Sequence, residues 1–315
     1  MQRRRIDFYS ALWALCLLLL LPAVSAYEAG AYDNPLVTQE RDVFRIVYSV
    51  EGPEAVPDTD SNGNGIPDSI EDMATQLSAA RDVFARMGFP DPLRSQRYAG
   101  VSGIMVIVRA RSSMQRLHGR AFSRASGSRL FPGKWLKIHI SSDTDPRRNS
   151  TPAHEYFHLI QYAQSRFMNG WYLEGMARWA EDAIRKVHVD PISKIDMKTP
   201  YCAKYTAAEQ FWHPLGVTCG GSVLIPSSVV NRYKYVDGTP VFKDDVINGP
   251  EAMRKVLACL HTKEIEAAES FGGLTTWRRD GQLTPLNTPF ILECVRETQN
   301  QCIRETPLRS PSERY

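Results

Sequence analysis

The feature that most constrains this chain is a pair of histidines four positions apart, with a glutamate directly after the first. In an α-helix, residues four apart lie on one face, so His154 and His158 can place two imidazole nitrogens on one metal ion. Glu155 lies at the adjoining edge of that face and can act as general base toward a metal-bound water without being a ligand. This segment is therefore expected to be helical, with Thr151 as its cap and Pro152 in the first turn.

A catalytic zinc site takes three protein ligands and keeps one position open, so a third ligand is needed. Glu174 stands at the start of a second expected helix, residues 173–187, which the turn at Asn169-Gly170 can fold back against the first. Its neighbours are apolar, so its carboxylate indicates a function. The alternative is that Glu174 only stabilises the helix N-terminus, a contribution of about 0.3–1 kcal/mol. We predict that His154, His158 and Glu174 hold Zn²⁺ and that Glu155 is the catalytic base.

Two sequence stretches carry a resemblance to a known family. They read His-Glu-Tyr-Phe-His-Leu-Ile-Gln and Trp-Tyr-Leu-Glu-Gly-Met-Ala-Arg-Trp-Ala-Glu. Both resemble the gluzincin peptidases, most closely secreted bacterial metalloproteases with a calcium loop ahead of the zinc helix, over residues 43–182. The resemblance implies the same zinc ligands and base. It also implies an α+β, zincin-like fold: a mixed sheet, an active-site helix and a mostly helical C-terminal lobe.

The resemblance carries two further implications. An antiparallel edge strand should lie above the cleft to hold the substrate backbone, and residues 135–141 stand at the right place for it. Some gluzincins have a carboxylate four residues after the third ligand to orient a histidine, whereas this chain has Arg178 there. Glu181 is the candidate for that orienting role. A salt bridge from Glu181 to Arg178 or Arg185 is the alternative.

Residues 60–71 form a second metal-binding motif, a twelve-residue loop with the EF-hand ligand scheme. Its hard oxygen donors suit Ca²⁺, and its two asparagines lower the charge, so millimolar extracellular calcium is the natural partner. The calcium would fix the following helix to the strand before it. An Asn/Gly-rich turn without metal is the alternative. The expected ligands are Asp60, Asn62, Asn64, the backbone carbonyl of Ile66, Asp68 and Glu71, with Gly65 at the sharp turn.

The N-terminus has the pattern of a secretory signal peptide. Arg3, Arg4 and Arg5 precede an apolar run over residues 11–21, and small residues follow at 24–26. The run is shorter than the roughly 20 residues that span a bilayer. We predict cleavage of residues 1–26 and a secreted or periplasmic protein without a membrane span; an uncleaved anchor is the alternative. The net charge of +3 falls to +1 on cleavage, so no nucleic-acid partner is implied.

Five cysteines follow the signal peptide, and an oxidising compartment favours disulfides. Neighbours in sequence suggest the pairs Cys202–Cys219 and Cys294–Cys302. Cys259 is then left over, either as a buried small hydrophobe or for intermolecular pairing. No two cysteines have the short spacing of a structural zinc site.

The rest of the chain divides around the two metal motifs. Residues 27–168 are expected to form an N-terminal lobe with both the calcium loop and the zinc helix, residues 169–305 a C-terminal lobe with the third zinc ligand, and residues 306–315 a disordered tail. The residue patterns predict strands at 43–50, at 104–108 in the sheet interior, and at 135–140 with one face exposed, and helices at 70–87 and 251–260.

The function that these motifs predict is an endopeptidase acting on a peptide or protein substrate. The alternative is a catalytically inactive, zincin-like calcium-binding module in adhesion or envelope assembly, against which the intact Glu155 argues. An aminopeptidase is a third option, but no segment plainly holds a free amine. The sequence ranks neither an oligomeric state nor the donors that could stabilise the oxyanion, which are Tyr201, Tyr205, His213, Tyr233 and Tyr235.

Overall fold

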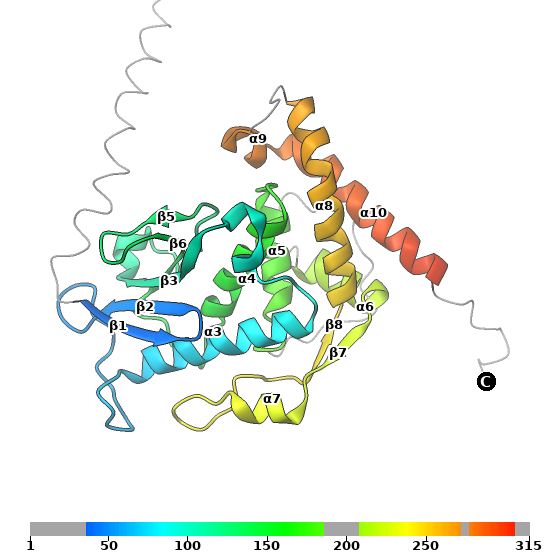
Figure 1. Ribbon diagram of the computed structural model, residues 1–315. Helices are drawn as coiled ribbons and strands as arrows, with labels where there is room; N and C mark the ends of the chain where they lie inside the picture. Colours follow the sequence, from blue (N-terminus) through cyan, green and yellow to red (C-terminus); the bar gives the residue numbers. More distant parts are fainter. Residues whose placement is uncertain (1–35, 186–207, 272–276, 306–315) are drawn as a thin grey trace, which may run out of the picture.

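The computed structural model describes residues 36–185, 208–271 and 277–305 (Figure 1). They form a mixed α+β fold in which one face of a mixed sheet is covered by helices and the C-terminal part is mostly helical. The predicted signal peptide, the predicted tail and Cys202 lie outside the described residues. Among those described, no helix combines the length and apolar character that crossing a membrane requires.

The sheet has the strand order β1-β2-β3-β6-β4, and β5 also pairs with β6. Strands β2, β3 and β6 are parallel, whereas β1 and β4 run antiparallel to their neighbours. The interior strand predicted at 104–108 is confirmed, because β3 is buried on both faces from Gly103 onward. The bounds are β1 (Leu36–Arg41), β2 (Phe44–Ser49), β3 (Val101–Arg109), β4 (Gly119–Ala121), β5 (Ser126–Gly127) and β6 (Lys134–Ser141).

Strand β6 corrects two predictions. It was expected to be half-exposed, but it is buried from Trp135 to Ser141, because Leu130 and Phe131 pack with Trp135 over the face opposite the helices. It was also expected to be the edge strand above the cleft. That expectation is wrong, because β3 pairs with β6 on one side and β4 and β5 pair with it on the other. The edge position beside the helix that carries His154 and His158 belongs to β4.

The helices of the N-terminal part follow the sequence pattern closely. Helix α3 (Asp68–Arg86) buries the predicted apolar face and packs on α4 (Thr151–Gln164). Thr151 does not cap α4: Ser150 occupies the N-cap position and Thr151 is the first helical residue, donating its hydroxyl to Asn149 Oδ1 at 2.6 Å. Helix α5 (Gly170–Ala180) begins three residues before the predicted start and ends well before residue 187.

The C-terminal part is built around two long helices that lie side by side, α8 and α10 (Figure 1). Helix α8 extends ten residues beyond the predicted end at 260. The remaining bounds are α6 (His213–Cys219), β7 (Ser222–Leu224), α7 (Ser227–Arg232), β8 (Val246–Asn248), α8 (Pro250–Ser270), α9 (Arg279–Leu283) and α10 (Thr288–Glu305), with a π-helical turn at Ala208–Trp212 and 3₁₀ turns at Pro92–Arg94, Gln96–Tyr98, Arg111–Met114 and Pro285–Asn287.

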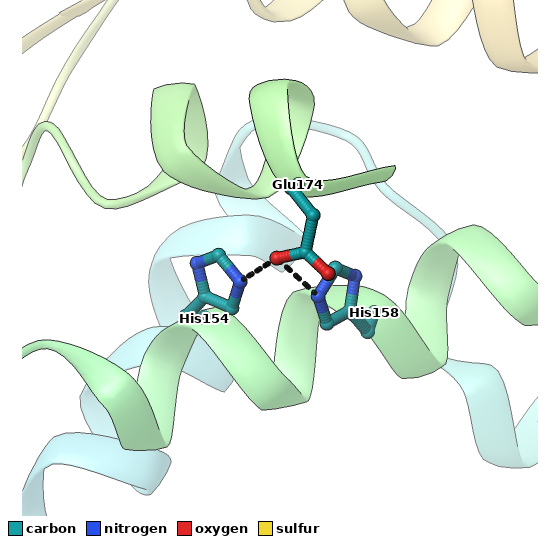
Figure 2. A group of neighbouring side chains, drawn as sticks. All are labelled: His154, His158 and Glu174. Carbon is teal, nitrogen blue, oxygen red and sulfur yellow. Dashed lines mark hydrogen bonds and ion pairs between the residues drawn. The ribbon is translucent and has the colours of Figure 1, made fainter. Parts of the chain in front are cut away.

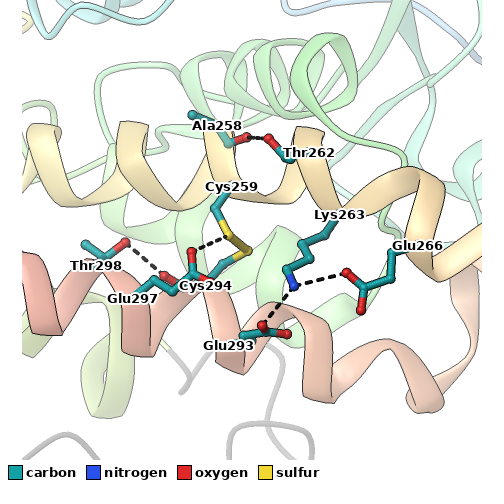
Figure 3. The surroundings of a disulfide bond; sticks show 9 residues. All are labelled: Ala258, Cys259, Thr262, Lys263, Glu266, Glu293, Cys294, Glu297 and Thr298. Atoms are coloured by element: carbon teal, nitrogen blue, oxygen red, sulfur yellow. Dashed lines mark hydrogen bonds and ion pairs between the residues drawn. A yellow bond between two sulfur atoms is a disulfide. The ribbon is translucent and has the colours of Figure 1, made fainter.

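A disulfide between Cys259 and Cys294 joins α8 to α10 (Figure 3). Its Cα atoms lie 5.5 Å apart. The predicted pair Cys294–Cys302 is therefore wrong, and so is the expectation that Cys259 is left over. Cys294 and Cys302 lie eight residues apart on one helix, which separates them by about 12 Å along its axis, too far for a disulfide.

Candidate metal centre

The structure brings His154, His158 and Glu174 together between α4 and α5 (Figure 2). Glu174 Oε2 lies 3.1 Å from His154 Nε2 and 3.6 Å from His158 Nε2. Potential ligand atoms of the three residues all lie within 4.8 Å of one another. Both histidines are buried and Glu174 is partly buried, so the cluster could hold one metal ion with limited access to solvent.

The second ring nitrogen of each histidine has a hydrogen-bond partner of its own. His154 Nδ1 lies 2.6 Å from Glu181 Oε1, and His158 Nδ1 lies 2.7 Å from Gln161 Oε1. Metal-binding histidines characteristically bond their other nitrogen in this way, which fixes the ring and the tautomer. Both Nε2 atoms are thereby left facing Glu174, as a shared cation requires.

Glu181 both orients a histidine and forms ion pairs with arginines, the two alternatives that the sequence left open. Its side chain is 3% exposed, and besides orienting His154 it contacts Arg178 Nη1 at 3.4 Å and Arg185 Nε at 3.7 Å. It also accepts a hydrogen bond from Ser150 Oγ. Sequence reasoning missed Gln161, although it follows His158 by three positions and so shares its helix face.

The electrostatics of the cluster favour a cation. Burial would lower the pKa of His154, but its hydrogen bonds to Glu174 and Glu181 outweigh burial and raise that pKa to about 10. Burial would conversely raise the pKa of Glu174, yet the two histidines hold it well below its usual range. The same carboxylates attract a divalent cation, which has to displace the proton of His154 in order to bind.

Glu155 lies beside the cluster and against the edge strand. It is 6% exposed, and the backbone N–H of Ala121 in β4 donates to its carboxylate. Burial raises the pKa of Glu155, and the nearby histidines only partly offset this effect. A carboxylate with a raised pKa is a better proton acceptor near neutral pH, which suits the predicted role of Glu155.

The cluster opens into a cleft of about 810 Å³. One wall is the segment from Arg116 to Ala121, which includes β4. Helices α4 and α5 border the cleft together with Arg279 at the start of α9. The predicted site residues His154, Glu155, His158 and Glu174 all line it.

Gly119 in β4 has no side chain, and the Glu155 carboxylate lies in the space that a side chain there would fill. A Cβ at this position would lie 2.5 Å from both Glu155 Oε1 and Thr151 Cγ2. We therefore expect Gly119→Ala to displace Glu155. If Glu155 is the base of a zinc peptidase, as the sequence predicts, the substitution should lower kcat/KM for peptide hydrolysis by about 10²-fold and leave the zinc affinity unchanged. Peptide kinetics beside a zinc titration would measure both. Gly127→Ala in β5 is the matched control, because nothing lies within 4 Å of a Cβ there; equal activity of the two variants would contradict the prediction.

The residues predicted as oxyanion donors lie elsewhere or outside the described residues. His213 Nδ1 lies 2.8 Å from Asp182 Oδ2, Tyr233 contacts Asp82, and Tyr235 bonds Gln76; none of these three lines the cleft. Tyr201 and Tyr205 lie outside the described part of the chain. The structure instead places Tyr162 in the cleft, stacked on the His158 ring with centroids 5.8 Å apart. Its position four residues after His158 was the available signal.

The predicted loop of residues 60–71 overlaps α3, whose first turn contains Asp68 and Glu71. Asn62 Nδ2 and Asn64 Nδ2 donate to the two carboxylate oxygens of Glu71 at 2.9 and 2.8 Å, and Gly65 N donates to Asp60 Oδ2 at 2.7 Å. Asp68 accepts from Ser61 N at 2.8 Å. Gly65, at the sharp turn, has a φ of +84°, which favours glycine. The side chains of Asn62 and Asn64 thus meet at Glu71, whereas Asp60 accepts hydrogen bonds from the backbone of the loop.

Comparison of this chain with models of protein families, with curated proteins and with solved structures gives no match. The geometry of the His154, His158 and Glu174 cluster and of its surroundings is therefore the basis of the functional argument.

Proposed function

We propose that this protein is a zinc-dependent metallopeptidase of the gluzincin type with a zincin-like fold. The observation that carries the proposal is the convergence of His154, His158 and Glu174 from two helices, with both Nε2 atoms turned toward the same carboxylate. Each Nδ1 atom is held by a partner, and a buried glutamate lies next to the cluster. Two imidazoles and one carboxylate are the donor set of several catalytic zinc sites, and they leave a position open.

The chain's own residues suit peptide hydrolysis. Bound zinc would polarise the peptide carbonyl and make a water more acidic. Glu155 then accepts the water proton and passes it to the leaving amine, held in place for both steps by the Ala121 N–H. Among the described strands, β4 pairs only with β6, so its other edge can align an extended peptide beside Glu155.

We also propose that the protein works outside the cytoplasm. The predicted signal peptide directs export, and the Cys259–Cys294 disulfide is the state expected in an oxidising compartment. Secretion or a periplasmic location agrees with both features.

Calcium in the loop of residues 60–71 is the second metal of the proposal. The amides of Asn62 and Asn64 can turn so that their oxygens, rather than their nitrogens, meet a cation beside Asp60 and Glu71.

With a Kd of 0.1–1 mM, 10 mM Ca²⁺ should raise the free energy of unfolding by about 1.4–2.7 kcal/mol. Denaturant unfolding with and without calcium tests this. Glu71→Gln should lose the effect and the exposed Asp58→Asn should keep it; the same gain in both variants would place the calcium elsewhere.

Hydrolysis of an unfolded protein tests the peptidase proposal. The zinc-loaded wild type should cleave casein, a chelator should stop cleavage, and added zinc should restore it. The competing function is an inactive calcium-binding module in adhesion or envelope assembly. Stoichiometric zinc without any cleavage in the presence of calcium would favour that module.

A further inference from the structure

The charges that line the cleft are unevenly distributed. Its lining contains four arginines and three carboxylates, and a bound divalent cation would add further positive charge. The whole chain, in contrast, has a net charge of only +3 over 315 residues. The lining thus has one more arginine than it has carboxylates, before any bound cation is counted. The arginines are Arg116, Arg120, Arg178 and Arg279.

The three carboxylates in the lining are already engaged. Glu174 lies between the two histidines, Glu155 is held against β4, and Glu181 is 3% exposed and bonded to His154. None of them offers a free negative charge to a substrate. A cationic side chain of a substrate would therefore find no partner among the acidic residues that line the cleft.

Three of the four arginines have no carboxylate partner among the described residues, although Arg120 lies over the Phe122 ring, 5.2 Å from its centroid. Arg178 contacts Glu181 at 3.4 Å. Within the described part of the chain, no carboxylate forms an ion pair with the exposed side chains of Arg116, Arg120 or Arg279. Arg116 and Arg120 belong to the wall that contains β4. Arg279 comes from α9, far along the sequence, and acts electrostatically on Tyr162 in α4.

We infer that the cleft selects peptides that present carboxylates on either side of the bond to be cleaved. This inference rests on the proposed function and names its substrate class. Because the carboxylates of the lining are engaged while Arg116, Arg120 and Arg279 have no carboxylate partner, the field that a ligand meets is positive and draws in ligands of negative charge. Arginine also binds carboxylates in a bidentate geometry, which adds orientation to attraction. The carboxylates come from acidic side chains or from a free C-terminus, two sources with the same chemistry.

Binding can be measured without turnover. The zinc-loaded Glu155→Gln protein is titrated, by fluorescence anisotropy, into labelled peptides of one sequence that carry Glu, Gln or Lys beside the central bond. Each peptide is made with a free and with an amidated C-terminus. At low ionic strength the Glu peptide should bind about tenfold more tightly than the Gln peptide, and the Lys peptide most weakly. Added salt should shrink the preference, because these arginines are exposed.

Arginine variants link the preference to the cleft. Arg279→Gln combined with Arg116→Gln should remove most of the preference for the Glu peptide. Arg278→Gln is the matched control, because Arg278 is the neighbouring arginine, is 84% exposed, contacts Asp280 and does not line the cleft. The peptides with a free C-terminus could be preferred over the amidated ones regardless of the residue beside the central bond. If the double variant loses that preference, the inference is supported and the recognised carboxylate is the C-terminus of the peptide.

Two results would overturn the inference. The first is that the Glu and Gln peptides bind with equal affinity, or do not bind, whether their C-terminus is free or amidated. The second is that the Arg116/Arg279 double variant keeps the full preference for the Glu peptide. Cleavage assays on the wild type separate this failure from that of the proposed function. Cleavage of peptides without any acidic preference would leave the peptidase in place and reject the inference. Selective binding of acidic peptides without cleavage by the wild type would reject the peptidase and leave only the preference of the cleft for acidic peptides.

Discussion

Glu155→Gln is expected to lower kcat/KM for peptide hydrolysis on the order of 10³-fold while zinc binding stays intact. Glutamine has the shape of glutamate but cannot accept the proton of the attacking water, and general-base catalysis contributes about 10²–10⁴-fold. The Ala121 N–H can still donate to the amide oxygen, so the side chain should remain in place against β4. Steady-state kinetics on a peptide substrate give the ratio directly.

Zinc content is the control for the Glu155 variant. Glu155 is the buried neighbour of the three candidate ligands but does not belong to their cluster. One zinc per chain is therefore expected in the wild type and in the variant alike. Retention of most of the activity by the zinc-loaded variant would show that another group accepts the proton.

Glu174→Ala is expected to weaken zinc binding on the order of 10³-fold. Structural zinc in small domains is bound with about 10–16 kcal/mol, so one ligand of three carries several kcal/mol. Glu174 Oε2 faces both Nε2 atoms, and no other carboxylate belongs to the cluster within the described residues. Competition with a chromophoric zinc chelator measures the affinity.

The matched control for Glu174 is Glu269→Ala. Glu269 is exposed on α8, so the substitution removes the same charge from a helix without touching the cleft. Its zinc affinity should equal that of the wild type. Equal affinities for all three proteins would remove Glu174 from the ligand set and leave only the two histidines.

The sequence predicts the cluster of His154, His158 and Glu174 well because these residues lie on regular elements. His154 and His158 share a helix face by their spacing, and Glu174 lies early on the next helix, so local periodicity is enough to bring them together. The apolar face of α3 and the buried strand β3 follow from the same kind of pattern. Glu181 was also found as an orienting candidate, because it lies two turns beyond Glu174.

The features that the sequence did not predict depend on contacts between distant segments. The partner of Cys294 lies on another helix, 35 residues away, and nothing in local spacing favours it over Cys302. Strand β4 is three residues long, too short for an alternating pattern, so β6 was taken as the edge strand instead. The burial of Trp135 depends on a loop that folds over the sheet, which residue alternation within β6 does not reveal.

The central claim is that three side chains from α4 and α5 share one zinc ion. Crystals of the zinc-loaded protein, measured at the zinc absorption edge, test it most directly. The account predicts one anomalous peak about 2.0–2.2 Å from Nε2 of His154, Nε2 of His158 and a carboxylate oxygen of Glu174. A peak elsewhere, or Glu174 turned away from the two imidazoles with no other oxygen or nitrogen in its place, would contradict it.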